Sequence, residues 1–551
     1  MSELIPGLLQ LAILLALIAG SYLLLGPYMA RVYTSPRHLA VERVIYRTLR
    51  IDPDGDQRWG VYYASVLGFS GVSLLFLYAL LRLQGKLPLS GGTDGFDPAL
   101  AWNTAVSFVT NTNWQAYAGE NLGYLAQMAG LAVQNFASAA VGMCVAVALI
   151  RGIVRSHTDR LGNFWTDLVR GVIRILLPIS IIVAVLLILT GVVQNFTGPE
   201  SVHALAGGSQ TLPGGPVASQ EVIKQLGTNG GGFYNANSAH PFENPNPVSN
   251  LIVVALMLII PFGLARTYGL MIGKPANGHA VLAFMGVLWL AGLVIMWIAE
   301  AAHGGIAADA AGAAMEGKEV RFGIAGSVLY NNASTGTSSG PVNAMGASFT
   351  GIGGGIMMLN MMLGEVSPGG TGSGLYGALL MAIMAVFLAG LMIGRTPEFL
   401  GKRIGRREIS YVALYTLAMP AVLLIGAAIA TINPAALASR TNAGSSGFSE
   451  ILYAFASASN NNGSAFAGLS ADTYFYNTML GFCMLIGRFI LIGLVLALAG
   501  SLAGQVSRPS SGSLPTHTPL FVGLHVFTAL IVAGLTFFPA LALGPIASAV
   551  S

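Results

Sequence analysis

Apolar stretches separated by short polar connections run along the whole 551-residue chain. Most of them hold the roughly 20 apolar residues that an α-helix needs to cross the hydrocarbon core of a bilayer. The pattern predicts ten membrane-spanning segments, at 4–30, 61–83, 122–150, 168–195, 247–271, 278–302, 348–394, 409–432, 472–503 and 519–545.

The stretch 348–394 is too long for one simple helix, and GEVSPGG at 364–370 interrupts it. It is either two helices joined by a tight turn, or one crossing built from a half-helix, an intramembrane loop and a second helix. Charge favours one crossing. The connections on one side then hold 19 of the 26 Lys and Arg residues: 31–60, 151–174, 266–274, 395–407 and 505–518. By the positive-inside rule this side is cytoplasmic, and the N-terminus is extracytoplasmic.

Composition supports a polytopic membrane protein. The chain is 54% hydrophobic and only 9% charged, whereas soluble proteins average about 25% charged residues. The basic residues lie in short connections, so the net charge of +4 does not indicate a nucleic-acid partner. Cys144 and Cys483 fall inside apolar stretches, which indicates neither a disulfide framework nor a thiolate metal site. The segment 4–30 lacks a basic start and a cleavage site, so we expect it to be retained as the first helix.

Four short polar loops interrupt the apolar pattern. Each follows an apolar stretch of roughly 10–15 residues that is too short to cross a bilayer. Non-helical backbone survives at membrane depth only where it is buried in protein or lines water. The loops are Thr110-Asn111-Thr112-Asn113-Trp114-Gln115, Gly227-Thr228-Asn229-Gly230-Gly231-Gly232, Thr337-Ser338-Ser339-Gly340 and Asn460-Asn461-Asn462-Gly463-Ser464.

The loops recur about 109 to 123 residues apart, each between an outgoing and a returning span. Repeats of two spans keep one orientation, so they run parallel around an axis normal to the membrane. We therefore expect an all-α polytopic membrane protein with four parallel pseudo-fourfold helix–pore-helix–helix repeats and one extra helix at each end. The predicted divisions are an N-terminal helix and cytoplasmic loop at 1–60, repeats at 61–160, 161–275, 276–400 (second helix broken) and 401–508, and a C-terminal helix at 509–551.

The short apolar stretches before the loops resemble re-entrant pore helices. Asp97 before Pro98 is a good helix start, and Ser219 and Ser449 are weaker candidates for the same capping role. Each such helix would direct the partial negative charge of its C-terminus at a loop, which favours a cation there.

Backbone carbonyl groups of the loops are the predicted ion ligands, because rings of carbonyls replace the hydration shell of an alkali cation. The carbonyl candidates are Asn111, Thr112, Thr228, Asn229, Ser338, Ser339, Asn461 and Asn462. We expect Gly230, Gly231, Gly340 and Gly463 to permit unusual backbone angles. Asn113 and Gln115 complete the candidate site.

The ion is expected to be monovalent. None of the four loops contains Asp or Glu, and Mg²⁺ or Ca²⁺ would need hard anionic oxygens. K⁺ is preferred over divalent ions, while Na⁺ and NH₄⁺ remain open alternatives.

Two charged residues fall at membrane depth. Arg488, in the span 472–503, should face a cavity or pore because a lipid-facing charge is costly. Glu365, with Gly369 and Gly370, lies in the broken span and is either a gating-loop charge or a water-facing turn residue. His240, His279 and His303 lie near span ends and are interpreted as interfacial, not as ligands.

No nucleotide-binding motif occurs in the sequence. The Gly-Lys pairs at 85, 273, 317 and 401 are not followed by Ser or Thr, and no Asp-Lys-Thr phosphorylation motif is present. We expect this chain to bind no nucleotide and to hydrolyse no ATP alone.

These motifs carry a resemblance to a known family. The stretch GTNGGGFYNANSAHPFENP from Gly227 closely resembles the second filter region of the potassium-binding subunits (KdpA) of the bacterial Kdp potassium-transporting ATPase, within the superfamily of K⁺ transporters. TNTNWQAY from Thr110, QNF from Gln134, Gly142-Met143 and NNNGSAFAG from Asn460 are similar to the same family. The third loop departs from it: Ser stands where a Cys is familiar, and Gly346-Ala347 replace a polar, acidic pair.

The resemblance implies a K⁺-selective subunit of an ATP-driven, high-affinity importer in the bacterial inner membrane. Its implied partners are a P-type ATPase subunit that hydrolyses ATP, a single-span accessory subunit and a small hydrophobic peptide subunit. In this family the ion is thought to pass the filter and then move sideways toward the pump subunit. The main alternative is a passive or ion-coupled K⁺ transporter or channel of the same superfamily. A substrate–proton symporter ranks far lower, because only Glu365 is an intramembrane carboxylate.

Overall fold

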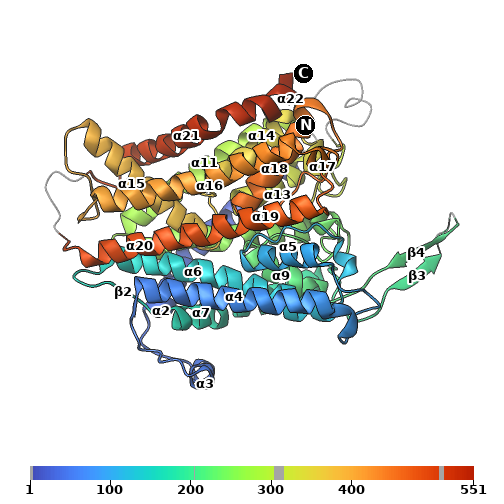
Figure 1. Cartoon of the computed structure of the whole chain (residues 1–551), viewed down its shortest axis with the longest axis horizontal. Coiled ribbons are helices and arrows are strands. Elements are labelled where there is room, and N and C mark those ends of the chain that lie inside the picture. The colour runs from blue at the N-terminus through green and yellow to red at the C-terminus, as the bar shows by residue number, and fades with distance from the viewer. Residues whose placement is uncertain (1–3, 204, 206, 303–314, 508–513, 551) are drawn as a thin grey trace.

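The fold is a bundle of long helices that run side by side (Figure 1). The structure is a computed structural model that describes residues 4–507 and 514–550, apart from 204, 206 and 303–314. Within these residues ten helices are long and apolar enough to cross a membrane, as predicted. They are Leu4–Thr34, Trp59–Lys86, Ala126–Val154, Phe164–Leu189, Pro247–Met271, Pro275–Ala301, Ser373–Met392, Arg406–Ile432, Tyr474–Gly504 and Pro519–Val550.

Most of these spans consist of α-helices. Short π-helical turns join two α-helices in four spans, and a fifth such turn begins the span Ala126–Val154. The α-helices are α1 (Leu4–Gly20), α2 (Gly26–Thr34), α4 (Trp59–Leu83), α6 (Val133–Val154), α7 (Phe164–Arg170), α8 (Leu177–Leu189), α10 (Pro247–Met271), α11 (Pro275–Ala301), α15 (Ser373–Met392), α16 (Arg406–Ile432), α19 (Tyr474–Leu485), α20 (Leu491–Gly504), α21 (Pro519–Leu541) and α22 (Ala547–Val550). The π-helical turns are η1 (Ser21–Leu25), η4 (Ala126–Ala132), η5 (Gly171–Leu176), η8 (Ile486–Ile490) and η9 (Ala542–Ile546).

Shorter elements fill the connections. The short α-helices are α3 (Ala40–Leu49), α5 (Pro98–Val109), α9 (Val217–Leu226), α13 (Gly323–Gly336), α14 (Gly351–Met362), α17 (Pro434–Leu437) and α18 (Gly444–Ser459). Three antiparallel strand pairs are β1 (Gln57–Arg58) with β2 (Arg160–Gly162), β3 (Glu200–His203) with β4 (Ser209–Leu212), and β5 (Glu398–Phe399) with β6 (Lys402–Arg403). The single-turn helices are η2 (Gln84–Lys86), η3 (Gly119–Asn121), η6 (Asn237–Ala239) and η7 (Gly346–Ser348).

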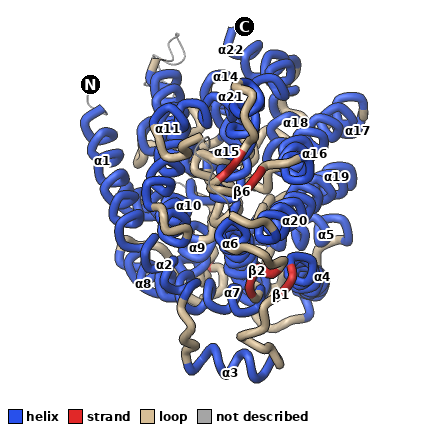
Figure 2. Tube along the Cα trace, turned by 90° about the vertical axis from the view of Figure 1, so that its left-hand side faces the viewer, coloured by secondary structure: helices blue, strands red, loops and turns tan. Residues whose placement is uncertain are grey.

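The two spans of each repeat differ in burial. In the most apolar 18 residues of each span, taken in repeat order, 28%, 22%, 44% and 39% of the residues are buried in the first spans and 89%, 78%, 67% and 56% in the second spans. The second spans meet one another at the centre, where α6 packs against both α15 and α20 and α10 reaches α15 (Figure 2). The first spans therefore surround a core made by the second spans, which is the fold expected of four parallel repeats.

The helices at the two ends of the chain lie outside this repeat pattern. α1 and α2 pack along α10, and α21 packs on α11 and α15. Their spans are only 22% and 28% buried, like other outer helices.

Hydrogen bonds join four of the five connections that were predicted to share one side, and Asn277, on the first turn of α11, lies three residues beyond the fifth. The Lys402 amino group donates to the carbonyl oxygens of Arg155 (2.6 Å) and Gln505 (2.8 Å). Asn277 donates to Thr516 (2.7 Å), and Arg151 donates to the Tyr33 carbonyl (3.3 Å). The segment 348–394 therefore crosses once. It is built from the short α14, a break and α15, as the charge asymmetry predicted.

The connections at the opposite end also join one another. Tyr124 donates to the Thr197 carbonyl (2.7 Å), and the Ala347 amide donates to the Phe466 carbonyl (2.8 Å). The hairpin β3–β4 projects from this end, and the short helices α5, α9, α13 and α18 lie in the same half of the bundle (Figure 1).

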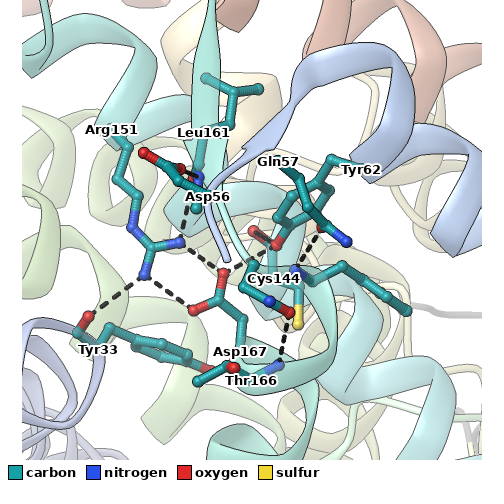
Figure 3. Close-up of polar contacts among 12 residues, drawn as sticks. Tyr33, Asp56, Gln57, Tyr62, Cys144, Arg151, Leu161, Thr166 and Asp167 are labelled. Carbon is teal, nitrogen blue, oxygen red and sulfur yellow. Dashed lines mark hydrogen bonds and ion pairs between the residues drawn. The ribbon is translucent and has the colours of Figure 1, made fainter. Parts of the chain in front are cut away.

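A buried ion pair ties the N-terminal helix to the first two repeats (Figure 3). Both terminal nitrogens of Arg151 on α6 donate to the Asp167 carboxylate on α7, with N···O distances of 2.5 and 2.8 Å. Tyr62 on α4 donates to the same carboxylate (3.0 Å). The remaining Arg151 contacts go to the carbonyls of Tyr33 and Leu161. Bidentate arginine–carboxylate geometry fixes orientation as well as charge, so the cluster holds α2, α4, α6 and α7 in register.

Some local predictions were wrong. Asp97 caps α5 and accepts from the Ala99 amide (2.9 Å), as expected. Ser219 caps nothing, because α9 already starts after Pro216. Ser449 lies inside α18, whose N-cap is Ala443. The two cysteines are buried and free, and His303 lies outside the described residues.

Candidate functional site

The four short helices end in the same backbone conformation. Each ends at the first residue of its loop, and the second loop residue has a positive φ. These second residues are Asn111 (φ 66°), Thr228 (φ 50°), Ser338 (φ 61°) and Asn461 (φ 58°). Bulky residues rarely adopt this left-handed region, so its recurrence at one position marks a true structural repeat.

The third loop residue repeats a second feature. Its amide donates to the carbonyl five residues back, which is the closing bond of a Schellman-type helix end. The bonds are Thr112 to Ser107 (2.9 Å), Asn229 to Lys224 (2.8 Å), Ser339 to Ser334 (3.1 Å) and Asn462 to Ser457 (2.8 Å). Helix end and loop are therefore one rigid unit, copied four times.

Close contacts between glycines and carbonyls join the loops in a ring. A Cβ atom on Gly230 would lie 2.8 Å from the carbonyl oxygens of both Thr112 and Ser339. A Cβ on Gly340 would collide with the Asn462 carbonyl, and one on Gly463 would collide with the Thr112 carbonyl. The loops thus meet in the order one, two, three, four and back to one.

Side-chain hydrogen bonds reinforce three of these junctions. Asn111 donates to the Thr228 carbonyl (2.8 Å), and Gln115 accepts from the Gly232 amide (2.8 Å). Asn461 donates to the Thr112 hydroxyl (2.9 Å). Ser338 donates to the Asn461 carbonyl (3.0 Å). The polar side chains of the loops therefore point mainly into the protein and hold the ring together.

The third-residue carbonyls stay available for an ion. Within the part of the chain that the structure describes, no donor reaches the carbonyl oxygens of Thr112, Asn229, Ser339 or Asn462. A buried carbonyl without a partner is costly, and a bound cation removes that cost. By contrast, the Thr228 and Asn461 carbonyls already accept side-chain bonds, so those two candidates are partly satisfied by protein.

The expectation about the glycines was only partly right. Gly231, Gly340 and Gly463 have positive φ, at 74°, 91° and 95°. Gly230 does not have a positive φ. A glycine at this position instead lets the carbonyls of Thr112 and Ser339 approach closely. The left-handed residues that recur in all four loops are Asn, Thr and Ser, which the sequence did not predict.

A buried ion cluster behind the second loop was also missed. Lys224 on α9 lies 2.6 Å from a Glu221 carboxylate oxygen and pairs with Glu243. It also donates to the Gly231 carbonyl (3.0 Å). Burial alone would lower the pKa of Lys224, but the two carboxylates outweigh burial and raise it. The spacing of Glu221 and Lys224 along one helix was the available signal.

The broken segment between α14 and α15 lies against the second and third loops. The Gly369 amide donates to the Gly336 carbonyl (2.8 Å), and the Thr371 amide donates to the Thr228 hydroxyl (2.8 Å). A Cβ on Gly370 would lie 3.0 Å from the Ser338 Cβ. The segment therefore contacts the inner ends of these loops directly.

Glu365 and Arg488 line the same cavity, of about 50 Å³, together with Asn460 and Asn461 of the fourth loop. Both charged side chains are buried. Arg488 donates to the Ser138 carbonyl (3.1 Å). Arg488 therefore lines a cavity and also bonds to the backbone of α6.

This arrangement suits a monovalent cation better than a divalent one. Among the described residues, no group of three or more His, Cys, Asp or Glu could hold a metal ion. Neutral carbonyls and helix C-termini attract a cation weakly enough for it to leave again.

Comparisons with known proteins agree with the sequence resemblance. The family model described as "Potassium-transporting ATPase A subunit" matches residues 12–550. The "Potassium-transporting ATPase potassium-binding subunit" of Kineococcus radiotolerans is 59% identical, covering 100% of this chain and 99% of its own. The protein of the same name from Mycobacterium avium is 57% identical over the full length of both chains.

A solved structure has a similar fold. The crystal structure of the potassium transporter TrkH from Vibrio parahaemolyticus aligns with a TM-score of 0.52 at 15% identity, covering 89% of this chain and 96% of that one. The family match spans nearly the whole sequence, including all four loops and the broken segment. This chain belongs to the family of potassium-transporting ATPase A subunits.

Proposed function

We propose that this chain captures extracytoplasmic K⁺ at the ring of four loops and delivers it to a P-type ATPase partner. The observation that carries the proposal is the ring of third-residue carbonyls, which accept no hydrogen bond from the residues that the structure describes. Its support comes from the fourfold backbone geometry and from family membership. In this role the chain is the non-hydrolysing subunit of a high-affinity, ATP-driven importer in the bacterial inner membrane, with its N-terminus outside.

The proposed selectivity filter includes the carbonyl donors and the residues that position them. Its members are Asn111, Thr112, Asn113, Gln115, Thr228, Asn229, Gly230, Gly231, Ser338, Ser339, Gly340, Asn461, Asn462 and Gly463. Asn113 donates to Asn135 on α6 (2.6 Å), and Gln115 clamps the second loop at Gly232. These two residues therefore fix the outer edge of the ring without supplying a charge.

The proposed ion path continues beside Glu365, Gly369, Gly370 and Arg488. The cavity there also has walls from α16 (Tyr415, Met419) and α21 (Ala533, Phe537). α16 and α21 are outer helices, so the cavity extends sideways from the filter toward the periphery of the bundle. A buried cation such as Arg488 below a cation filter opposes passive leakage, which suits a pump subunit better than a channel.

Partners follow from the missing ATP motifs and from the family. We infer a P-type ATPase subunit, a single-span accessory subunit and a small hydrophobic peptide subunit. The competing function is passive or ion-coupled K⁺ transport by this chain alone. We keep this alternative because the fold is similar to that of TrkH, a potassium transporter.

Reconstitution distinguishes the two functions. The chain is placed in liposomes alone and as the co-purified complex, and K⁺ uptake is measured with and without ATP. We expect ATP-dependent uptake from the complex and little flux from the chain alone. Uptake by the isolated chain that ignores ATP would favour the alternative.

Two filter variants test the site assignment. Gly230→Asp places a carboxylate between the Thr112 and Ser339 carbonyls, and Gln115→Arg puts a cation at the clamp. Both should weaken apparent K⁺ affinity or relax the ranking of K⁺ over Rb⁺ and NH₄⁺. Gly198→Asp is the control, because a Cβ at Gly198 meets nothing within 4 Å. If both filter variants keep the apparent K⁺ affinity and the ion ranking unchanged, the filter does not lie at these residues.

A further inference from the structure

The connection between the first two spans contains an amphipathic helix, α3 (Ala40–Leu49). At 100° per residue, one face of α3 carries Val41, Val44, Ile45 and Leu49, while Arg43 and Arg47 lie on the opposite side. The only fully buried side chains of the helix are Glu42 and Tyr46. The apolar face therefore borders the strip that contacts the protein at Ile45, which is half-buried, and leaves Val41, Val44 and Leu49 exposed.

α3 lies across the direction of the spans. Figure 2 looks along the bundle, and α3 extends in the plane of that view at its periphery. In Figure 1 it lies below α7, outside the bundle. A helix in this orientation is parallel to the plane of the membrane.

An ion pair places α3 beside the first three turns of a span. Glu42 pairs with Arg174, whose guanidinium also donates to the Arg37 carbonyl (2.7 Å). Arg174 lies ten residues beyond Phe164, the first residue of its span, or about 15 Å along the helix at 1.5 Å per residue. Arg174 is also the last residue of the predicted connection 151–174, so α3 lies where that connection meets the apolar part of the span.

The unpartnered surface of α3 combines exposed apolar and cationic groups. Val41, Val44 and Leu49 are 47%, 64% and 60% exposed. Arg43 and Arg47 are exposed, and Arg37 and Arg50 flank the helix. Such a surface at this depth would meet acyl chains on one side and headgroups on the other.

We propose that α3 is an interfacial helix that binds anionic phospholipid. Val41, Val44, Ile45 and Leu49 enter the acyl-chain boundary, and Arg43 and Arg47 reach lipid phosphates. Charge complementarity selects anionic headgroups, since arginine pairs with phosphate through two nitrogens. The proposal needs only the membrane placement of the bundle, so it fails or holds independently of the potassium site.

Site-specific fluorescence tests the occupant directly. The two native cysteines of this chain are buried, so Val44→Cys adds an accessible thiol for an environment-sensitive dye, and the parent complex treated with the same dye gives the background from other subunits. The labelled, complete complex is placed in nanodiscs of phosphatidylglycerol and phosphatidylcholine. Quenching is then compared between doxyl-labelled lipid and aqueous iodide.

Two further labelled positions calibrate the scale. Leu8→Cys, on α1, is the lipid-facing reference, and Val202→Cys, on β3 of the projecting hairpin, is the aqueous reference; the native residues are 51% and 44% exposed. The proposal predicts lipid quenching at Val44→Cys closer to Leu8→Cys than to Val202→Cys. Predominant iodide quenching would overturn it in favour of a solvated helix. Protection from both quenchers would overturn it in favour of a protein partner.

The charge requirement has its own test. The Arg43→Gln/Arg47→Gln complex should retain less phosphatidylglycerol through purification, measured by mass spectrometry, and should lose lipid quenching at Val44→Cys as phosphatidylglycerol is diluted. Arg406→Gln/Arg407→Gln is the control, because both arginines are exposed on α16. Equal retention by the two double variants would contradict anionic-lipid binding by α3.

Discussion

The second loop and the other three reach one backbone geometry by different chemistry. A residue that we call the brace stands three positions before the first residue of each loop: Ser107, Lys224, Ser334 or Ser457. The serines of the first and third repeats donate to the fifth loop residue, at Trp114 (3.0 Å) and Pro341 (2.6 Å). Lys224 makes the same bond to Gly231 with an ammonium group.

The difference follows from what surrounds each brace. A serine hydroxyl can donate to a loop carbonyl without burying a charge, whereas a buried ammonium group must be paired with an anion. Glu221 and Glu243 supply that pairing, and Glu243 also accepts from the amides of Phe233 (3.1 Å) and Tyr234 (3.3 Å). The glycine-rich second loop has few side chains of its own, so a charged cluster orders the chain beyond it.

The largest expected effect comes from removing the charged brace. Lys224→Met leaves two carboxylates buried without their cation, which costs about 3–5 kcal/mol. We expect a marked fall in the Tm of the purified complex and loss of K⁺-dependent ATPase activity.

Two controls show whether the loss comes from unpaired charge. Lys274→Met, at an exposed lysine, should leave Tm unchanged. Adding Glu221→Gln and Glu243→Gln to Lys224→Met should recover much of the stability. An unchanged Tm in Lys224→Met alone would mean that the cluster does not brace the loop.

The second-largest effect should come from replacing a glycine in the ring of loops. Gly463 has φ 95°, and its Cβ would overlap the Thr112 carbonyl. Gly463→Ala therefore adds about 1–3 kcal/mol of backbone strain and displaces one ion ligand. We expect the half-saturating K⁺ concentration for ATPase activity to rise by tenfold or more, with Gly198→Ala unchanged. Equal apparent K⁺ affinities for the two variants would show that the junction at Gly463 does not position an ion ligand.

Removing a serine brace should have a smaller effect than either change above. Ser334→Ala deletes two bonds, to Pro341 and from the Gly340 amide (3.0 Å), at a cost of about 1 kcal/mol each. A few-fold loss of apparent K⁺ affinity is expected in transport assays. Ser410→Ala, at an exposed serine on α16, is the matched control. A Ser334→Ala effect as large as that of Lys224→Met would erase the distinction between the two kinds of brace.

The smallest expected effect is a pH dependence that belongs to the second loop alone. Burial raises the pKa of Glu221 from 4.5 to about 7, against the opposing charge of Lys224. The fold therefore favours neutral Glu221: this stabilisation is complete below about pH 4.5 and is lost as pH rises through about 7. The groups facing it are Lys224, Gln225, Ser238, Glu243 and Tyr330.

Deprotonation adds a negative charge near the ring, so apparent K⁺ affinity should improve on the order of twofold between pH 6 and pH 8. Measuring half-saturation for transport across this range checks the expectation. Glu221→Gln should flatten the profile, and a profile that Glu221→Gln leaves intact would assign the titration to another group.

The sequence predicted the large features because they depend on long-range composition. Ten spans, the single broken crossing and the shared side of the loops follow from apolar length and charge asymmetry. The helix start at Asp97 was readable because its cap is local. Ser219 and Ser449 misled because polar residues also occur inside buried pore helices, where they bond within the protein.

Other features depend on tertiary contacts that no local pattern encodes. The left-handed Asn111 and Ser338 are held by bonds to neighbouring loops. Lys224 acquires its role only when the chain folds back to bring Glu243 beside it. The helix α3 was missed because its apolar residues are sparse and flanked by arginines, a pattern that we interpreted as a loop.

The central claim is that the four loops together hold one monovalent cation. Anomalous scattering from crystals of the complex soaked in Rb⁺ or Tl⁺ tests it most directly. We predict a peak enclosed by the carbonyls of Thr112, Asn229, Ser339 and Asn462, weakened by excess K⁺ and absent in Gly463→Ala. A peak beside Glu365 with none between the loops, in a complex that still transports K⁺, would contradict the account.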